Sequence, residues 1–172
     1  DFTQLILNKK FDNFGILASR GKINKEIVNL FLKNPFFFKC PPKSLDRQDF
    51  KEDFFKALEY KVSNENFLAS ICEVTALSIS KALNFLPTYP KNIIFSGGGV
   101  QNTFIMDRLK QHIKCNLLNL KKFGLNEDFI EAQLIGFLTV RAINKLPITF
   151  PKTTGVKKPL TGGDIYMPTK NH

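Results

Sequence analysis

Apolar residues recur at helical spacing in several stretches, and these alternate with short apolar runs typical of buried strands. The longest helix is predicted from about Asn66 to Leu86. Apolar side chains surround most of its circumference there, which indicates a central, buried helix. Shorter helices are predicted, in chain order, over residues 22–33, about 47–58, about 102–113 and 126–146.

Two short apolar runs, Lys91 to Phe95 and Cys115 to Leu120, are predicted to be strands. Because they alternate with helices, the order of elements is typical of an α/β fold with parallel strands. Asn126 is the expected N-cap of the last helix, since Glu127 and Asp128 after it suit the positive end of a helix dipole.

Length and composition are those of one globular domain or one lobe of a larger protein. The 172 residues are 43% hydrophobic, and no apolar stretch reaches the roughly 20 residues that a membrane span needs. The formal charge of +10 comes from lysines scattered singly or in pairs, which argues against a nucleic-acid-binding face. The chain begins at Asp1 without a signal sequence or an initiator methionine, so we interpret it as a fragment. The tail 147–172 is rich in Pro, Gly and Thr and is predicted to be loop with one edge strand over 163–166.

Cysteines and isolated polar residues receive structural interpretations. The three cysteines are widely spaced, which argues against a disulfide framework and against a zinc site and favours a reducing, cytoplasmic compartment. Cys72 lies within an apolar helical pattern and is predicted to be core. Asp12 is expected to form an Asx-type turn, and Glu73 and His112 are expected at the surface.

Three consecutive glycines, Gly97, Gly98 and Gly99, follow the first predicted strand and precede a predicted helix. Two interpretations are open. The glycines can leave backbone N–H groups accessible to a phosphate or a nucleotide, or they can form a tight turn that lets the helix pack on the strand. The pattern matches neither the dinucleotide fingerprint nor the P-loop.

Other stretches of the sequence resemble those of a known protein family. The chain resembles the C-terminal lobe of the anhydro-N-acetylmuramic acid kinase family in P-P-K-S-L-D-R-Q-D-F (41–50), F-S-G-G-G-V-Q-N-T-F-I-M (95–106) and G-L-N-E-D-F-I-E-A-Q (124–133). Shorter matches carry the resemblance over nearly the whole chain: F-D-N-F-G-I-L-A-S-R-G-K-I (11–23), E-V-T-A (73–76), T-T-G-V (153–156) and G-G-D-I-Y-M-P (162–168).

The resemblance implies an actin-like, hexokinase-type ATPase of ribonuclease H-like fold, with two lobes, a sheet flanked by helices and ATP in the cleft. It also implies the reaction of the family. ATP and water open the ring of 1,6-anhydro-N-acetylmuramic acid and give N-acetylmuramic acid 6-phosphate, a step of bacterial peptidoglycan recycling. Mg²⁺ would accompany ATP by bridging its phosphates.

Site residues follow from the same resemblance. Gly97–Gly99 and Asn102 are expected along the adenosine and phosphate side of the nucleotide, and Glu131 is expected to face the sugar and the attacking water. Lys43 and Ser44 fall in a segment expected near the cleft. The structural alternatives are a solvated carboxylate for Glu131, a solvated loop for Lys43 and Ser44, and a helix N-cap for Asn102.

The chain also departs from the family pattern. Leu45-Asp46 stands where the family has T-G, and E-A-Q-L-I-G-F (131–137) replaces E-A-x-A-F-A-W. The glycine- and threonine-rich phosphate motif and the D-T-G-P-G-N segment with the aspartate base are not in this sequence. A kinase needs both a base and a phosphoryl clamp, so the chain is expected to be inactive without the missing N-terminal lobe. The alternative is a non-catalytic remnant that binds nucleotide or a partner lobe, and the oligomeric state, a homodimer included, stays open.

Overall fold

The computed structural model describes residues 2–126 and 129–166. These residues divide into two compact units, which are considered separately. The first comprises the described parts of Asp1–Cys40 and Leu45–Glu127, and the second those of Pro41–Ser44 and Asp128–His172.

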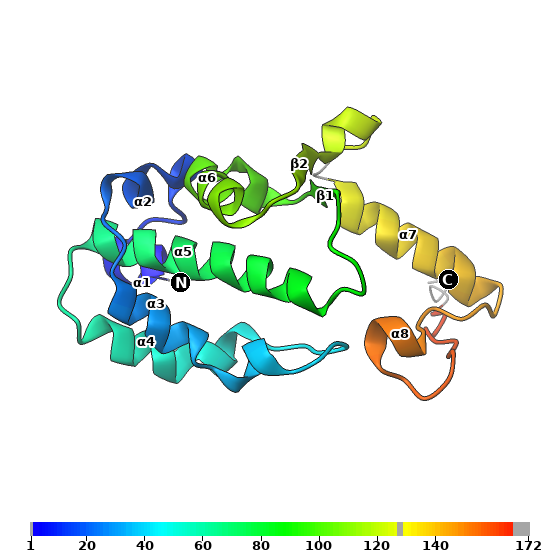
Figure 1. Cartoon of the computed structure of the whole chain (residues 1–172). Coiled ribbons are helices and arrows are strands. Elements are labelled where there is room, and N and C mark those ends of the chain that lie inside the picture. The colour runs from blue at the N-terminus through cyan, green and yellow to red at the C-terminus, as the bar shows by residue number, and fades with distance from the viewer. Residues whose placement is uncertain (1, 127–128, 167–172) are drawn as a thin grey trace, which may run out of the picture. The chain divides into compact units, whose positions relative to one another are not determined.

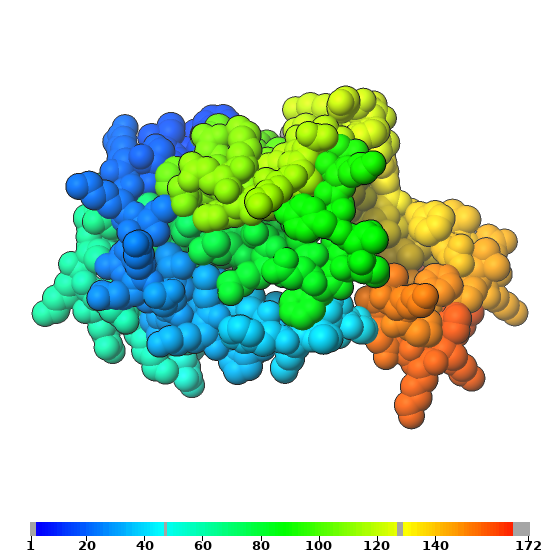
Figure 2. Space-filling view, in the orientation of Figure 1, coloured from blue at the N-terminus to red at the C-terminus, as the bar shows by residue number. Residues whose placement is uncertain are grey.

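The first unit is built around the long helix α5 (Asn64–Ala82), which the 3₁₀ turn η4 (Leu83–Phe85) extends. Ser63 caps its start by accepting a hydrogen bond from the backbone N–H of Asn66. Figure 1 shows α5 between α2 (Ile16–Arg20) and α6 (Thr103–His112) on one side and α3 (Lys25–Leu32) and α4 (Lys51–Leu58) on the other. In the space-filling view of Figure 2, the light-green atoms belong to α6, and the blue and cyan atoms belong to α3 and the segment after it. These two groups lie on opposite sides of the green chain at the end of α5.

Burial of α5 confirms that this helix is central, as its apolar pattern predicts. The main core cluster contains side chains from α2, α3, α4 and α5, of which the buried members are Ala18, Ile27, Val28, Phe31, Ala57, Phe67, Leu68, Cys72 and Val74. A smaller cluster joins the other end of α5 to α6 and the strands through Ala76, Leu109 and Ile113.

The two predicted strands are confirmed as β1 (Asn92–Phe95) and β2 (Asn116–Asn119), which pair in parallel with Asn92 opposite Asn116. Helix α6 connects them, so β1, α6 and β2 form a βαβ unit. The other elements described in this unit are α1 (Phe2–Leu7) and the 3₁₀ turns η1 (Asn13–Gly15), η2 (Pro35–Phe38), η3 (Arg47–Phe50), η5 (Gly98–Gln101) and η6 (Leu120–Phe123). The chain is therefore α/β, with a small parallel sheet flanked by helices.

The second unit contains α7 (Ile130–Ile143) and the short α8 (Pro151–Thr154). Helix α7 starts at Ile130 with Phe129 at its N-cap, four residues after the predicted start. The predicted capping role of Asn126 involves Glu127 and Asp128, which lie outside the described residues. The predicted edge strand over 163–166 is wrong. A strand requires a partner, and residues 163–166 have none among the described residues. The described part of the tail instead has an isolated antiparallel bridge between Thr149 and Leu160.

The apolar face expected on α7 is present in the sequence but is not buried. Leu134 and Phe137 are 53% and 58% exposed, and every residue of α7 is at least partly exposed. Among the described residues, no helix combines the length and apolar character needed to cross a bilayer.

One close backbone contact shows how tightly the first unit is packed. Gly21 follows α2, and a Cβ atom at this position would lie 2.7 Å from the backbone nitrogen of Asn66 and still closer to the carbonyl group of Glu65. Its φ of −87° is ordinary, so the requirement for glycine is steric.

The first prediction is that Gly21→Ala lowers the free energy of unfolding by about 1–3 kcal/mol, the usual cost of overpacking. Gly98→Ala is the matched control, because a Cβ at Gly98 meets no atom within 4 Å. The control should change stability by less than about 0.5 kcal/mol. Urea unfolding followed by circular dichroism measures both, and equal stabilities of the two variants would contradict the prediction.

Candidate functional site

The glycine loop lies at the carboxyl end of β1, where the chain passes into α6. Gly97 has φ +86° and ψ 172°, a conformation that essentially only glycine adopts. The 3₁₀ turn η5 (Gly98–Gln101) follows, and Asn102 is then the N-cap of α6. Its side-chain oxygen accepts a hydrogen bond of 3.0 Å from the N–H of Ile105, which confirms the N-cap role.

Gly98 and Gly99 have no comparable conformational or packing requirement in the described part of the chain. A Cβ atom built at either position meets nothing within 4 Å, so the tight-packing interpretation fails for both. Neither N–H group has a backbone acceptor among the described residues, whereas Val100 donates to Gly97 and Asn102 to Gly99. The loop therefore offers two N–H groups and open space beside them, a local arrangement suited to an anion.

A second turn, from an earlier part of the chain, packs against the residues that follow the glycine loop. Gly15 has φ +74°, and a Cβ there would lie 2.8 Å from Cγ of Asn102. The hydroxyl of Thr103 donates to the carbonyl oxygen of Phe14 at 3.0 Å. The turn thus packs directly on the residues that start α6 and fixes the side chain that caps it.

Asp12 holds this turn, although not in the way predicted. Its two carboxylate oxygens accept hydrogen bonds from the backbone N–H groups of Leu17 (2.9 Å) and Ala18 (3.0 Å), at the start of α2, so the expected Asx-type turn is wrong.

Cys72 is buried, as predicted. Burial, with a smaller contribution from the charge of Asp12, raises the pKa of the Cys72 thiol to about 12, which excludes it as a nucleophile at neutral pH.

A buried ion pair fixes α6 against α5. Glu73 is only 5% exposed, so its predicted surface position is wrong. Its carboxylate accepts hydrogen bonds from Arg108 at 2.5 and 2.8 Å, and its Oε1 lies 2.8 Å from Nε2 of His112. Arg108 and His112 are four residues apart and share one helix face, the sequence signal that could have indicated a common partner.

The charges of this cluster shift the acidity of Glu73. Burial raises the pKa of Glu73, but hydrogen bonds and charges from Arg108 and His112 outweigh it, so the pKa lies below the usual value of 4.5. The carboxylate is therefore ionised at neutral pH and links α5 to α6, the helix that begins where the glycine loop ends.

The other predicted site residues lie in the second unit. Glu131 is in the first turn of α7 and is exposed, Ser44 is exposed, and Lys43 is half-buried. The structure thus brings together Gly97–Gly99 and Asn102 within the first unit, while Lys43, Ser44 and Glu131 belong to the second.

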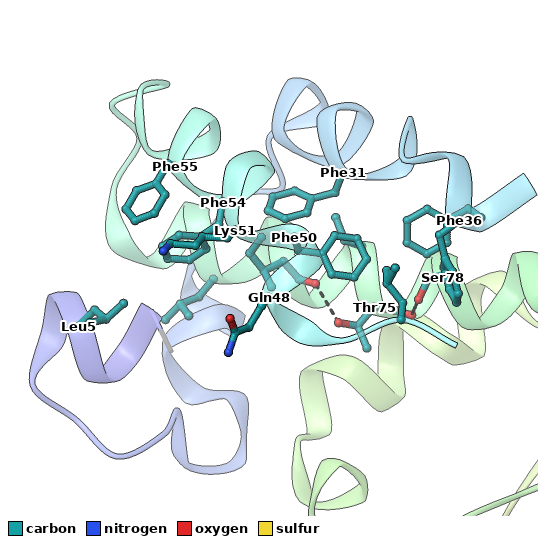
Figure 3. Close-up of a pocket in the computed structure, with 15 residues that line it drawn as sticks. Leu5, Phe31, Phe36, Gln48, Phe50, Lys51, Phe54, Phe55, Thr75 and Ser78 are labelled. Carbon is teal, nitrogen blue, oxygen red and sulfur yellow. Dashed lines mark hydrogen bonds between the residues drawn. The ribbon is translucent and has the colours of Figure 1, made fainter. Parts of the chain in front are cut away.

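An apolar pocket of about 810 Å³ lies elsewhere in the first unit, and no predicted site residue lines it. Figure 3 shows the rings of Phe31, Phe50 and Phe54 gathered on one side of it, with Thr75 and Ser78 of α5 in its wall. This lining is suited to apolar groups and not to phosphates. Among residues 2–126 and 129–166, no three His, Cys, Asp or Glu side chains come together as metal ligands.

A parallel strand that runs through a glycine loop into a capped helix is an anion-binding arrangement common in α/β nucleotide-binding proteins. Comparison with known proteins agrees with this class. The sequence matches the model of the family "AnmK: Anhydro-N-acetylmuramic acid kinase" over residues 2–168, and the chain therefore belongs to that family.

Individual relatives share substantial identity with the chain. It is 38% identical over 156 residues to an anhydro-N-acetylmuramic acid kinase of Zymomonas mobilis, covering 91% of this chain and 42% of the relative. It is 36% identical over 168 residues to one of Acidiphilium cryptum, covering 98% of this chain and 46% of the relative. The chain thus spans less than half the length of the curated relatives it matches.

The second prediction concerns the buried ion pair. Glu73→Gln should lower the free energy of unfolding at pH 7 by about 2 kcal/mol, because the amide loses the charge-assisted bonds but can still accept one. Since the folded pKa of Glu73 is depressed, its contribution is present above pH 4.5, the ordinary value, and is lost as the pH falls through the folded pKa.

Urea unfolding of both proteins between pH 7 and pH 3 should therefore show curves that converge in acid. Glu59→Gln, at an exposed position after α4, is the control and should change stability by less than about 0.5 kcal/mol at pH 7. A constant difference between wild type and Glu73→Gln at all pH values would contradict the account.

Proposed function

We propose that this chain is the C-terminal part of an ATP-dependent anhydro-N-acetylmuramic acid kinase, and that it forms one lobe of an actin-like, ribonuclease H-like enzyme of the cytoplasm. The observation that carries the proposal is the glycine loop, where two glycines have no role in the chain's own packing. Family membership over residues 2–168 supports the same conclusion. The alternative of a non-catalytic remnant lacks a comparable supporting observation.

The loop fits a nucleotide that carries phosphates. The N–H groups of Gly98 and Gly99 have no backbone acceptor among the described residues, and the space beside them is open. These groups would bind phosphate oxygens of ATP at the start of α6, where the helix dipole favours negative charge. ATP supplies the transferred phosphoryl group, and Mg²⁺ would bridge its phosphates with few protein ligands.

Asn102 would act mainly by holding the loop. Its side-chain oxygen is already used to cap α6, and the turn at Gly15 packs against it. Glu131 would accept a hydrogen bond from the sugar or from the attacking water. This bond would hold the sugar or the water in the orientation that the reaction needs. Lys43 and Ser44 would lie near the cleft that holds ATP.

The third prediction tests nucleotide binding. In a complete kinase assembled from this chain and the part of the Zymomonas mobilis relative that it does not match, Gly98→Val should weaken binding of a non-hydrolysable ATP analogue at least about tenfold, or about 1.4 kcal/mol. The branched side chain would occupy the space next to the N–H groups. Gly98→Ala should show a smaller loss in the same direction.

Isothermal titration calorimetry measures both affinities, and urea unfolding checks that the variants are folded. A Cβ at Gly98 meets no atom within 4 Å in the described chain, so the folded state should tolerate both substitutions. If both folded variants bind the analogue as tightly as wild type, the glycine loop is not the nucleotide site.

The fourth prediction tests Glu131. In the same assembled kinase, Glu131→Gln should reduce kcat/KM for the sugar roughly ten- to a hundredfold, because a charge-assisted hydrogen bond is worth about 1.5–3 kcal/mol. Affinity for ATP should be unchanged. Glu52→Gln, whose side chain is 90% exposed on α4, is the control and should turn over normally. Wild-type kinetics for Glu131→Gln would mean that Glu131 is a surface carboxylate.

A further inference from the structure

Two consecutive lysines follow β2 at the edge of the sheet where the glycine loop follows β1. The strands are parallel and Phe95 lies opposite Asn119, so the carboxyl ends of both strands lie at one edge. Gly97 is two residues beyond Phe95, and Lys121 is two residues beyond Asn119. Because neighbouring strands are about 4.8 Å apart, the two connections leave the sheet from adjacent positions. Ligands of α/β sheets bind outside this edge.

The turn that carries the lysines, η6, is held at both ends. The side-chain oxygen of Asn119 accepts a hydrogen bond of 2.8 Å from the backbone N–H of Lys121. The N–H of Gly124 donates to the carbonyl oxygen of Lys121 at 3.0 Å, and Leu120 is buried. Figure 1 shows η6 as the yellow-green turn that follows β2. Lys121 and Lys122 in the middle of this turn are exposed, so a fixed backbone presents two cationic side chains to solvent.

The charge of the surrounding segment favours an anionic ligand. Residues 74–126 contain seven Lys and Arg residues but one acidic residue, Asp107. Of the cations, Arg108 binds Glu73 and Lys110 binds Asp107. The segment that contains the glycine loop therefore has an excess of positive charge, which attracts phosphates to this part of the molecule.

We propose that Lys121 and Lys122 form a second, cationic part of the nucleotide site and bind phosphate oxygens of ATP from the side of β2. The N–H groups of Gly98 and Gly99 would bind the same polyphosphate from the side of β1. Lysine suits this role because its ammonium group is a compact charge on a flexible stem. The inference rests on the proposed function and deepens it, since it adds side-chain charge to a site otherwise made of backbone N–H groups.

The test uses the assembled kinase described above. The double variant Lys121→Gln/Lys122→Gln should weaken binding of the non-hydrolysable ATP analogue at least about tenfold, because it removes charge-assisted hydrogen bonds to phosphate. Adenosine has no phosphate, so its affinity should stay within about twofold of wild type. The variant Lys121→Arg/Lys122→Arg keeps both charges and should bind the analogue within about threefold of wild type.

A matched control separates local contact from net charge. Lys91 and Lys114 are exposed and precede β1 and β2, so they lie at the opposite edge of the sheet. Lys91→Gln/Lys114→Gln removes the same two charges and should bind the analogue within about threefold of wild type at 0.15 M salt, where charges more than about 8 Å away are screened. Isothermal titration calorimetry measures the affinities, and urea unfolding confirms that each variant is folded.

Three results would overturn this inference: wild-type affinity of the folded Lys121→Gln/Lys122→Gln variant, an equal loss in the Lys91→Gln/Lys114→Gln control, or an equal loss of adenosine affinity. If Gly98→Val weakens binding and Lys121→Gln/Lys122→Gln does not, this inference fails alone and the proposed nucleotide site stands. If the wild-type kinase does not bind the analogue, the proposed function itself fails.

Discussion

Burial of α5 is the constraint on which the rest of the first unit depends. Helices α2, α3 and α6 pack against it, and the ion pair between Glu73 and Arg108 fixes α6 in addition to apolar contacts. Because α6 begins where the glycine loop ends, the packing of α5 also sets the position of the loop. A chain of apolar and ionic contacts thus connects the longest helix to the candidate nucleotide site.

The same unit is incomplete in a specific way. In the described residues its sheet has two strands, and α7 of the second unit exposes apolar side chains such as Leu134 and Phe137. Exposed apolar surface of this kind marks sites of contact with further protein. This agrees with a chain that spans less than half the length of its relatives.

The sequence was sufficient for features that depend on local pattern. The long periodic helix α5, both strands and the glycine loop were predicted because hydrophobic spacing and glycine chemistry act over a few residues. Helices α1 and α2 were missed, since they have only six and five residues and show little periodicity. Burial of Glu73 could not be predicted from its own neighbours, because its partners come from another helix. The role of Glu131 rested on resemblance alone.

The central claim is that this chain carries the nucleotide-binding half of a kinase whose catalysis needs the other half. Its most direct test is sugar-dependent ADP release from ATP and 1,6-anhydro-N-acetylmuramic acid, measured for the chain alone and after addition of the unmatched part of the Zymomonas mobilis relative. The account predicts no release above the blank for the chain alone and clear release from the mixture. Sugar-dependent release by the chain alone, or none from a mixture shown to form a complex, would contradict it.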